Sequence, residues 1–511
     1  MLFSSGSLPG EDSWPSPIEW HSLNASIGGR LIHSVPPGSV CYPEWPNYNT
    51  KACDEVISQW TAAKFHPSNP ISINSPVWTN SSCNPIFPNG TSVTGDPHAG
   101  EKGCSIGSYP VYVINATDAS HVQGALRFAQ RWNLRTNIKN MGLNGSGSIW
   151  THHMKRIDYT ANSIATGSLN RNGSGQMTFT LGAGIQEGEL FDALPLHNVI
   201  AVGGITKTSS SQMTFSIRTY SRLSAGGGGG TFRVVVNLTL KAFLMPSVVV
   251  CDLNLSARNG TCAKAWWDLI ARVHRLLPGA LDKGLSRYYI IKGPPGFSMV
   301  TYSGSLFMDD AEVAAAEAAM RPLEQLLGAA KYTVTWSTGC VRFDTFSELI
   351  SQLPTFENVG TVNRISASRL LTRDTLKNKQ DILAQTLKRV APRADGLPNY
   401  SVSGTLTVSQ KPIHNALNPA WRNTTVHFIT SRLLDDSALR ELDRGSGSYL
   451  NGANAFEPGW QWSFFGANYT RLREIKRRYD PDDLLWCPQY VGSEGWAQDD
   501  TCRLCPLYQP F

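Results

Sequence analysis

The strongest constraint on the fold lies between residues 111 and 150, where a strand, a helix, a second strand and a glycine loop follow one another. Val111 to Ile114 form a short β-run, and Asp118 then precedes apolar residues at helical spacing, as an N-capping residue does. The second strand, "LRTNIKN", leads directly into "MGLNGSGSIW". Such a loop can bring several backbone N–H groups to a phosphate. A working cofactor loop, a damaged one and an ordinary turn are the alternatives.

The composition predicts a folded protein with more than one domain. Of its 511 residues, 41% are hydrophobic and 16% are charged, which argues against disorder. The net charge of +6 is spread along the chain, and the one tight basic cluster, Lys476-Arg477-Arg478, lies beside acidic residues. We expect a solvated helix end there, and no nucleic-acid partner. The apolar stretch 232–255 contains charged residues and a proline, so it predicts two buried strands and no membrane span.

The cysteines and glycosylation sequons favour the secretory route or an extracellular location. Plausible short-loop disulfides join Cys41 to Cys53, Cys83 to Cys104 and Cys251 to Cys262, although spacing does not fix connectivity. The "CRLC" at 502–505 has no second ligand pair, so we predict no metal site. The first residues do not resemble a signal peptide, so secretion would require a start upstream. The sequons begin at Asn24, Asn80, Asn89, Asn115, Asn144, Asn172, Asn237, Asn254, Asn259, Asn399, Asn423 and Asn468.

Changes in pattern divide the chain into four segments. Residues 1–105 are rich in Pro, Trp, Asn and Ser, and include a helical turn capped by Ser16. Residues 106–245 contain the strand–helix–strand pattern and five successive glycines, Gly226 to Gly230. These glycines allow close approach to a ligand, and a flexible linker explains them nearly as well.

The rest of the chain has a different pattern. Residues 246–445 alternate strands with an alanine-rich helix capped by Asp309 or Asp310, which predicts an α+β sheet with helices on one face. Residues 446–511 contain a helix, "NYTRLREIKRRY", and a Trp- and Pro-rich tail. This closing segment is too short for a core of its own, so we expect it to pack back onto the domain formed by 106–245.

Three stretches resemble one protein family. Residues 447–496, "GSYLNGANAFEPGWQWSFFGANYTRLREIKRRYDPDDLLWCPQYVGSEGW", resemble the closing domain of the berberine-bridge-enzyme-like, FAD-linked oxidoreductases of vanillyl-alcohol-oxidase type. Residues 9–42 resemble the start of the fungal subgroup, and "NALNPAWRNT" resembles its substrate-domain strand. The resemblance implies an α+β protein in which a bipartite FAD-binding domain is joined to a substrate domain with an antiparallel sheet. It also implies oxidation of a small organic substrate by oxygen, in secondary metabolism such as alkaloid biosynthesis.

Against this family pattern, the glycine loop is a damaged flavin site. In the family a histidine of this loop is bonded to the flavin 8-methyl group, and here Leu143 takes its place. A second anchoring cysteine would be expected near Ile205, but no cysteine lies between Cys104 and Cys251. The loop is also shortened before Ser148. We therefore expect FAD to bind weakly and without a covalent bond.

The resemblance also implies which residues surround the cofactor and the substrate. Tyr449 is the candidate catalytic residue, although core packing is the alternative for Tyr449 and Tyr469. Gly452 occupies a position where the family usually has a glutamate, and His152 and His153 are expected to be structural. The cofactor-binding candidates are Asn140, Gly142, Asn144, Gly145, Gly227, Gly228, Gly229, Asn451, Asn468 and Tyr469.

Three functions are consistent with these residues. The first is an FAD-linked oxidase that is impaired by its shortened cofactor domain. The second is a flavin-independent isomerase or cyclase that uses the substrate cavity and general acid–base contacts, for example from Tyr449. The third is a non-catalytic relic. Titration with FAD separates the first function from the other two, and turnover without flavin separates the second from the third.

Overall fold

The structure is a computed structural model, and its chain divides into two compact units. The first unit comprises residues 1–244, 354–363 and 470–511, and the second comprises 245–353 and 364–469. The described residues are 7, 9–76, 80–139, 147–163, 175–201, 203, 230–294, 297–352, 359–360, 366–392, 401–406, 415–430, 437–452, 454, 456–498 and 504–507.

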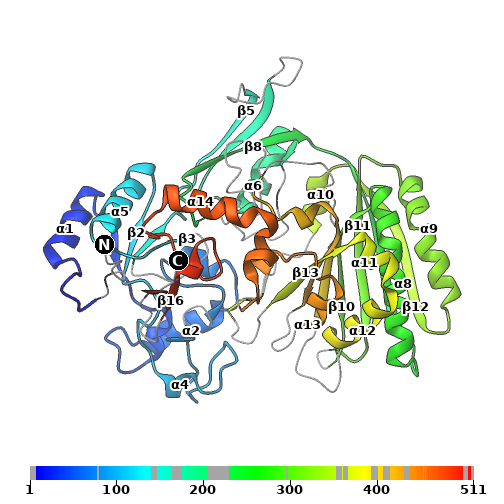
Figure 1. Cartoon of the computed structure of the whole chain (residues 1–511), viewed down its shortest axis with the longest axis horizontal. Helices are drawn as coiled ribbons and strands as arrows, with labels where there is room; N and C mark the ends of the chain where they lie inside the picture. The colour runs from blue at the N-terminus through cyan, green and yellow to red at the C-terminus, as the bar shows by residue number, and fades with distance from the viewer. Residues whose placement is uncertain are drawn as a thin grey trace. The chain divides into compact units, whose positions relative to one another are not determined.

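The strand–helix–strand pattern forms a four-stranded sheet in the first unit, in the order β1-β2-β4-β3. Its strands are β1 (Leu31–His33), β2 (Tyr112–Asn115), β3 (Thr136–Lys139) and β4 (Gly147–Trp150). The strand β4 runs parallel to both β2 and β3. The helices α5 (Ala119–Arg131) and α1 (Pro17–Ser26) pack on one face through a shared apolar core, and the predicted N-caps Asp118 and Ser16 are confirmed (Figure 1).

A second sheet of this unit is antiparallel, in the order β5-β6-β8-β7. Its core contains apolar side chains of the sheet, of α6 (Glu187–Ala193) and of the following turn Leu194–His197. The stretch 232–255 forms the two expected strands, because β8 belongs to this sheet and β9 to the second unit. The prediction that both are buried is wrong for β8, where Phe243 and Leu244 are exposed. The strands of this sheet are β5 (Ile157–Ser163), β6 (Gln176–Gly182), β7 (Val199–Ala201) and β8 (Asn237–Leu244).

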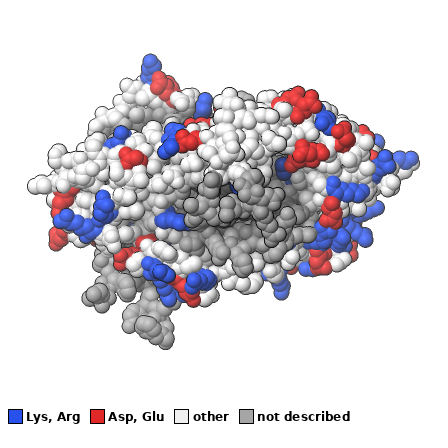
Figure 2. Space-filling view, turned by 90° about the horizontal axis from the view of Figure 1, so that it is seen from above, with Lys and Arg blue, Asp and Glu red and all other residues white. Residues whose placement is uncertain are grey.

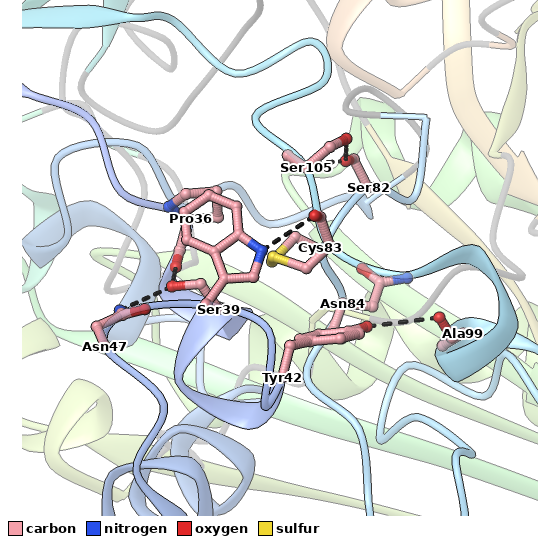
Figure 3. Close-up of a disulfide and its surroundings, with 11 residues drawn as sticks. Pro36, Ser39, Tyr42, Asn47, Ser82, Cys83, Asn84, Ala99 and Ser105 are labelled. Atoms are coloured by element: carbon pink, nitrogen blue, oxygen red, sulfur yellow. Dashed lines mark hydrogen bonds between the residues drawn. A yellow bond between two sulfur atoms is a disulfide. The ribbon is translucent and has the colours of Figure 1, made fainter.

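Two disulfides stabilise the segment between β1 and β2, where sheet structure is sparse. Cys41 is bonded to Cys53, which lies near the N-terminus of α2 (Thr50–Gln59), and Cys83 is bonded to Cys104. Two of the proposed pairings are therefore confirmed. The Trp45 indole donates a hydrogen bond to the Cys104 carbonyl at 3.0 Å, and the Tyr42 hydroxyl donates to the Asn84 carbonyl at 2.7 Å. Figure 3 shows this packing around Cys83. The short helices α3 (Phe65–Ser68) and α4 (Ala99–Lys102) belong to the same segment.

The second unit is built on a seven-stranded antiparallel sheet, in the order β12-β9-β11-β10-β14-β15-β13. Helices packed against the sheet share one large apolar core with it, and Figure 1 shows α8, α9 and α12 on the same face. The strands are β9 (Val248–Ala257), β10 (Ser286–Lys292), β11 (Thr301–Asp309), β12 (Val334–Phe343), β13 (Ala367–Thr372), β14 (Ser401–Leu406) and β15 (Thr424–Thr430). The helices are α8 (Ala263–Asp282), α9 (Val313–Ala329), α10 (Phe346–Gln352), α11 (Arg373–Asn378), α12 (Gln380–Val390) and α13 (Ser437–Leu442).

Two local predictions in this unit are wrong. Cys251 is bonded to Cys340, its direct register partner on β12, and Cys262 is free and exposed. The two cysteines are 89 residues apart in sequence and meet because β9 pairs with β12. Spacing along the chain could not reveal this disulfide. The alanine-rich helix α9 begins at Val313 without a side-chain cap, because Asp309 pairs with Val248 in the sheet and ends β11.

The closing helix α14 (Tyr469–Tyr479) contains a third error. Lys476, which we expected at a solvated helix end, is 2% exposed. Its ammonium group forms an ion pair with Asp480 and donates hydrogen bonds to the carbonyls of Thr231 (2.7 Å) and Leu485 (3.1 Å). The neighbouring Arg477 is exposed, as expected.

Surface charge and helix hydropathy are both unremarkable. On the face shown in Figure 2, basic and acidic side chains lie close to one another. Within the described part of the chain, no helix combines the length and the apolar character that a membrane crossing requires.

We expect Lys476→Met to lower the free energy of unfolding by about 3–5 kcal/mol, because it leaves the Asp480 carboxylate buried without its cation. Urea unfolding followed by tryptophan fluorescence measures this change. The matched control is Arg477→Met on the exposed face of the same helix, for which we expect a change within about 0.5 kcal/mol. Equal effects of the two substitutions would contradict a structural role for the ion pair.

Candidate functional site

The face of the first sheet opposite α5 carries buried polar groups without partners. Ile114 and Ile149 point into the core shared with α5, so the residues that alternate with them face the other way. Asn137 and Ser148, register partners on β3 and β4, are 7% and 0% exposed. Neither amide atom of Asn137 nor the Ser148 hydroxyl has a hydrogen-bond partner within the described ranges. An unpaired buried group costs about 1–3 kcal/mol, so these atoms indicate where a polar ligand or water binds.

Lys139 lies two residues further along β3, where the glycine loop begins. It is 2% exposed, and its ammonium group donates a hydrogen bond to the His66 carbonyl at 2.9 Å. Burial lowers the pKa of Lys139 to about 7. Its register partner Trp150 donates to the Pro67 carbonyl at 3.0 Å, so the segment around residues 66–67 covers this end of the face.

The residues on this face fit a flavin cofactor. The Ser148 hydroxyl and the Asn137 amide can donate hydrogen bonds to phosphate or ribityl oxygens, and the Lys139 ammonium group supplies positive charge beside the loop. The loop candidates themselves lie outside the described residues, and so do three of the sequons. These are Asn140, Gly142, Leu143, Asn144, Gly145, Gly227, Gly228 and Gly229, together with the sequons at Asn144, Asn172 and Asn399.

His152 and His153 follow β4 and pack locally. The His152 ring stacks on Trp150 with a centroid distance of 5.7 Å, and burial lowers the pKa of His152 to about 4. His153 Nδ1 lies 2.7 Å from Asn115 Oδ1. The contacts of His153 agree with the structural role expected for it. His152 Nδ1 is buried and has no hydrogen-bond partner among the described residues, so a structural role for His152 stays a prediction.

In the second unit, a row of hydrogen bonds attaches the segment 446–449 to β13. The Leu370 amide donates to the Gly447 carbonyl at 2.8 Å, and the Tyr449 amide donates to the Ser368 hydroxyl at 3.2 Å. The hydroxyls of Ser446 and Ser448 donate to the carbonyls of Leu370 and Ser368. These hydrogen bonds therefore hold the backbone of Tyr449 against β13.

A buried ionic group supports the same segment. Arg369 on β13 donates two hydrogen bonds to the Asp443 carbonyl, at 2.8 and 3.1 Å. The carboxylate of Glu457 lies 3.9 Å from Arg369 and 3.7 Å from Arg440, and accepts a hydrogen bond from Ser463 at 2.8 Å. These contacts connect both sides of the segment that carries Tyr449.

The ring of Tyr449 meets two other aromatic rings, those of His427 on β15 and Trp421 in the turn Pro419–Arg422. The centroid distances are 5.4 Å from Tyr449 to His427, 5.8 Å from Tyr449 to Trp421 and 5.5 Å from Trp421 to His427. Tyr449 meets both neighbours nearly edge-on, a favourable aromatic geometry. We call these three residues the aromatic cluster.

His427 is the residue of the cluster that can do chemistry without rearrangement. It is 5% exposed, and its Nε2 has no hydrogen-bond partner among the residues that the structure describes. Burial lowers the pKa of His427 to about 4, so the imidazole is neutral near pH 7. A buried, neutral imidazole with an unpaired nitrogen can exchange a hydrogen bond or a proton with a ligand.

Gly452 leaves one side of this imidazole without a side chain. A Cβ atom at Gly452 would lie 3.8 and 3.9 Å from Cε1 and Nε2 of His427, and 3.7 Å from Cδ1 of Tyr449. These are ordinary contact distances, so a side chain at position 452 would lie against the rings of His427 and Tyr449. The glycine that departs from the family pattern thus lies directly beside His427.

The remaining candidates of the closing segment have other neighbours. The side-chain amide of Asn468 donates to the Leu417 carbonyl at 2.9 Å. Tyr469 packs against Trp460 and Phe465, with centroid distances of 5.5 and 5.8 Å. Asn451 lies in the turn Leu450–Gly452, and its side chain is outside what the structure describes.

His427, Asn137 and Ser148 are not among the site residues predicted from the sequence. A signal for His427 was present, because a single histidine interrupts the apolar run "TVHFIT" directly after "NALNPAWRNT". A lone histidine in a buried strand is usually a core residue, and only its unpaired nitrogen distinguishes it.

The chain is similar to known FAD-linked oxidoreductases. Residues 448–492 match the family described as "Berberine and berberine like". The "FAD-linked oxidoreductase sor8" of Hypocrea jecorina is 27% identical over 570 residues, covering 99% of this chain and 94% of the relative. The "VAO-type flavoprotein oxidase VAO615" of Thermothelomyces thermophilus is 29% identical, with 98% and 94% covered. The "Bifunctional decalin synthase calF" of Penicillium decumbens is 26% identical, with 98% and 95% covered.

A solved structure agrees over the whole chain. The VAO-type flavoprotein MtVAO615 from Myceliophthora thermophila C1 superposes with a TM-score of 0.83 at 25% identity, covering 99% of this chain and 100% of that one. The α+β fold expected from the sequence is therefore confirmed.

We expect Asn137→Leu to reduce the increase in melting temperature that added FAD produces, because it removes a group that fits the cofactor. Without FAD, the variant should be as stable as the parent or more stable, because both unpaired atoms are gone. Differential scanning fluorimetry with and without FAD measures both effects. The control, Asn237→Leu at an exposed position of β8, should keep the full FAD shift, and an unchanged shift in Asn137→Leu would exclude this face from cofactor binding.

Proposed function

Because the chain belongs to the berberine-bridge-enzyme-like, FAD-linked oxidoreductases of vanillyl-alcohol-oxidase type, we propose that it oxidises a small organic molecule held at the aromatic cluster. The family makes it an enzyme. The observation that carries the proposal is the Nε2 of His427 beside Tyr449, which is buried, neutral and without a hydrogen-bond partner among the described residues. We further propose that the substrate is a secondary-metabolite intermediate and that oxygen accepts the electrons.

In this proposal His427 and Tyr449 orient the substrate and move its proton. A substrate hydroxyl donates a hydrogen bond to Nε2, and the neutral imidazole accepts the proton as the substrate is oxidised. Trp421 and Tyr449 provide flat apolar contacts and help to exclude water. When bound, FAD supplies the two-electron chemistry. Asn137, Ser148 and Lys139 are the described side chains that we assign to holding it, through hydrogen bonds and charge.

A second function has support of its own. The aromatic cluster lies wholly within the second unit, so its acid–base groups do not require the altered glycine loop. One relative is named a decalin synthase. A flavin-independent isomerisation or cyclisation by His427 and Tyr449 is therefore the alternative, and turnover by FAD-free protein would favour it over oxidation.

We predict that FAD, if retained, is not covalently attached. An aliphatic side chain at Leu143 cannot bond to the flavin, and no thiol lies between Cys104 and Cys251. Protein purified with added FAD should release all its yellow colour to the supernatant on acid precipitation. Flavin retained in the washed pellet would contradict this prediction, whereas a colourless soluble protein would favour the flavin-independent alternative.

Substitutions in the aromatic cluster test the proposed proton transfer. Peroxide formation by the FAD-loaded protein, screened over small alcohols and phenols, identifies a working substrate. With that substrate, His427→Leu should lower kcat about 10²–10⁴-fold, the usual contribution of a general base. Ile429→Val, on the same strand, is the matched control and should keep the parent rate. A parent-like kcat in His427→Leu would exclude His427 from the reaction.

The pH profile gives a second readout of His427. Because only the neutral imidazole accepts a proton and its pKa is about 4, kcat should be level near pH 7 and fall as the pH approaches 4. Gly452→Glu adds a carboxylate beside the ring, which favours the protonated form and raises the pKa of His427. The acidic limb of the profile should therefore move to higher pH in Gly452→Glu, and an unmoved limb would show that another group titrates.

A further inference from the structure

The sequons differ in what their hydroxyl group contacts. Several of the described sequons have a third-position Ser or Thr whose hydroxyl forms a hydrogen bond. In most of them the hydrogen-bond partner is a residue other than the sequon asparagine. The Thr261 hydroxyl, for example, donates to the Thr333 carbonyl at 2.8 Å, and the Thr239 hydroxyl pairs with Thr180 at 2.9 Å. The same holds for Ser26 (to Leu23), Ser82 (to Ser105) and Thr117 (to His121).

The sequon Asn89-Gly90-Thr91 is different. The Thr91 hydroxyl donates a hydrogen bond to the side-chain oxygen of Asn89 itself at 2.7 Å, and the Thr91 amide donates to the same oxygen at 3.1 Å. The Asn89 side chain is exposed. Two hydrogen bonds to the amide oxygen polarise the amide and hold it in one orientation, which leaves the side-chain nitrogen uncommitted.

A short hairpin presents this asparagine at its tip. The Phe87 amide donates to the Thr91 carbonyl at 2.8 Å, the Gly90 amide donates to the Phe87 carbonyl at 2.9 Å, and Ile86 bridges to Ser92. Gly90 has a φ of +81°, in the left-handed region that favours glycine. All these contacts lie within residues 86–92, so the turn can form before distant parts of the chain have folded.

The disulfides independently point to the compartment in which glycosylation takes place. Cys41–Cys53, Cys83–Cys104 and Cys251–Cys340 are formed, and such bonds persist in oxidising compartments. Cys83 lies close before the hairpin, so the bond to Cys104 also anchors its base.

We propose that Asn89 carries an N-linked oligosaccharide and that the Gly90 turn, in addition to the sequon, determines its occupancy. The donor is an oligosaccharide linked to a polyprenyl diphosphate. The side-chain nitrogen of Asn89 attacks the anomeric carbon, a C–N bond forms, and the C–O bond to the diphosphate breaks. One amide proton passes to a base of the transferase, the polyprenyl diphosphate leaves, and no group is oxidised or reduced. This proposal does not depend on the proposed oxidase activity.

The proposal is tested by measuring the glycan occupancy of each sequon in the full chain. For this measurement, an added leader directs the chain into the secretory route of a fungal host. An amidase that releases N-glycans in ¹⁸O-water converts each glycosylated asparagine into labelled aspartate, which mass spectrometry counts peptide by peptide. We expect Asn89 to be largely occupied. An unoccupied Asn89 would overturn the proposal.

Two substitutions at position 90 separate the turn from the sequon, because both keep the sequon intact. Gly90→Ala meets no atom within 4 Å, so its only defect is the positive φ, which lowers the turn population about fivefold or more. Gly90→His, which tolerates that φ better than alanine and adds no second sequon, is the matched control. We expect occupancy to fall several-fold in Gly90→Ala and to persist in Gly90→His, counted in secreted and retained protein together. Equal occupancy in both variants would refute the role of the turn.

Discussion

The buried ammonium group of Lys476 connects parts of the first unit that are far apart in sequence. It pairs with Asp480 and reaches the carbonyls of Thr231 and Leu485, so the closing helix is joined to the chain that follows the glycine run. Asp480 in turn accepts hydrogen bonds from the amides of Leu484 and Leu485. The Leu484 carbonyl then accepts from the Thr136 amide, at the start of β3. The strand that leads into the glycine loop is thus fixed from its outer edge by residues almost 350 positions later.

The second unit shows a contrast between paired and unpaired polar groups. Around Tyr449, the groups that position the backbone are satisfied, because Ser446, Ser448, Arg369 and Glu457 all have partners. His427, which faces the same ring, is buried, and its Nε2 has no hydrogen-bond partner in the part of the chain that the structure describes. Burying an unpaired polar group costs free energy. Such a group beside rigidly held residues is therefore typical of a ligand-binding site. Asn137 and Ser148 in the first unit also have buried side-chain polar atoms without a hydrogen-bond partner among the described residues, as a ligand-binding site would.

Local signals in the sequence predicted local structure well. Asp118 and Ser16 cap their helices, and the strand, helix and strand around them occur where the pattern indicates. The disulfides Cys41–Cys53 and Cys83–Cys104 close short loops. Motifs of the closing segment were sufficient to identify the family and, through it, the fold. The predictions failed where a partner lay far away in sequence, as for Cys251, or where sheet pairing competed with a helix cap, as for Asp309.

The sequence by itself therefore determined the elements, the resemblance to the family, and the presence of Leu143 with no cysteine between Cys104 and Cys251. Those properties depend on residue type and on spacing over a few turns, which the sequence displays directly. Only the tertiary structure decided that Lys476 is buried, that Cys251 pairs with Cys340 and that His427 lies unpaired between Trp421, Tyr449 and Gly452. Burial and pairing depend on which distant segments meet. A histidine in an apolar strand has the same neighbours in sequence whether its nitrogen is satisfied or free.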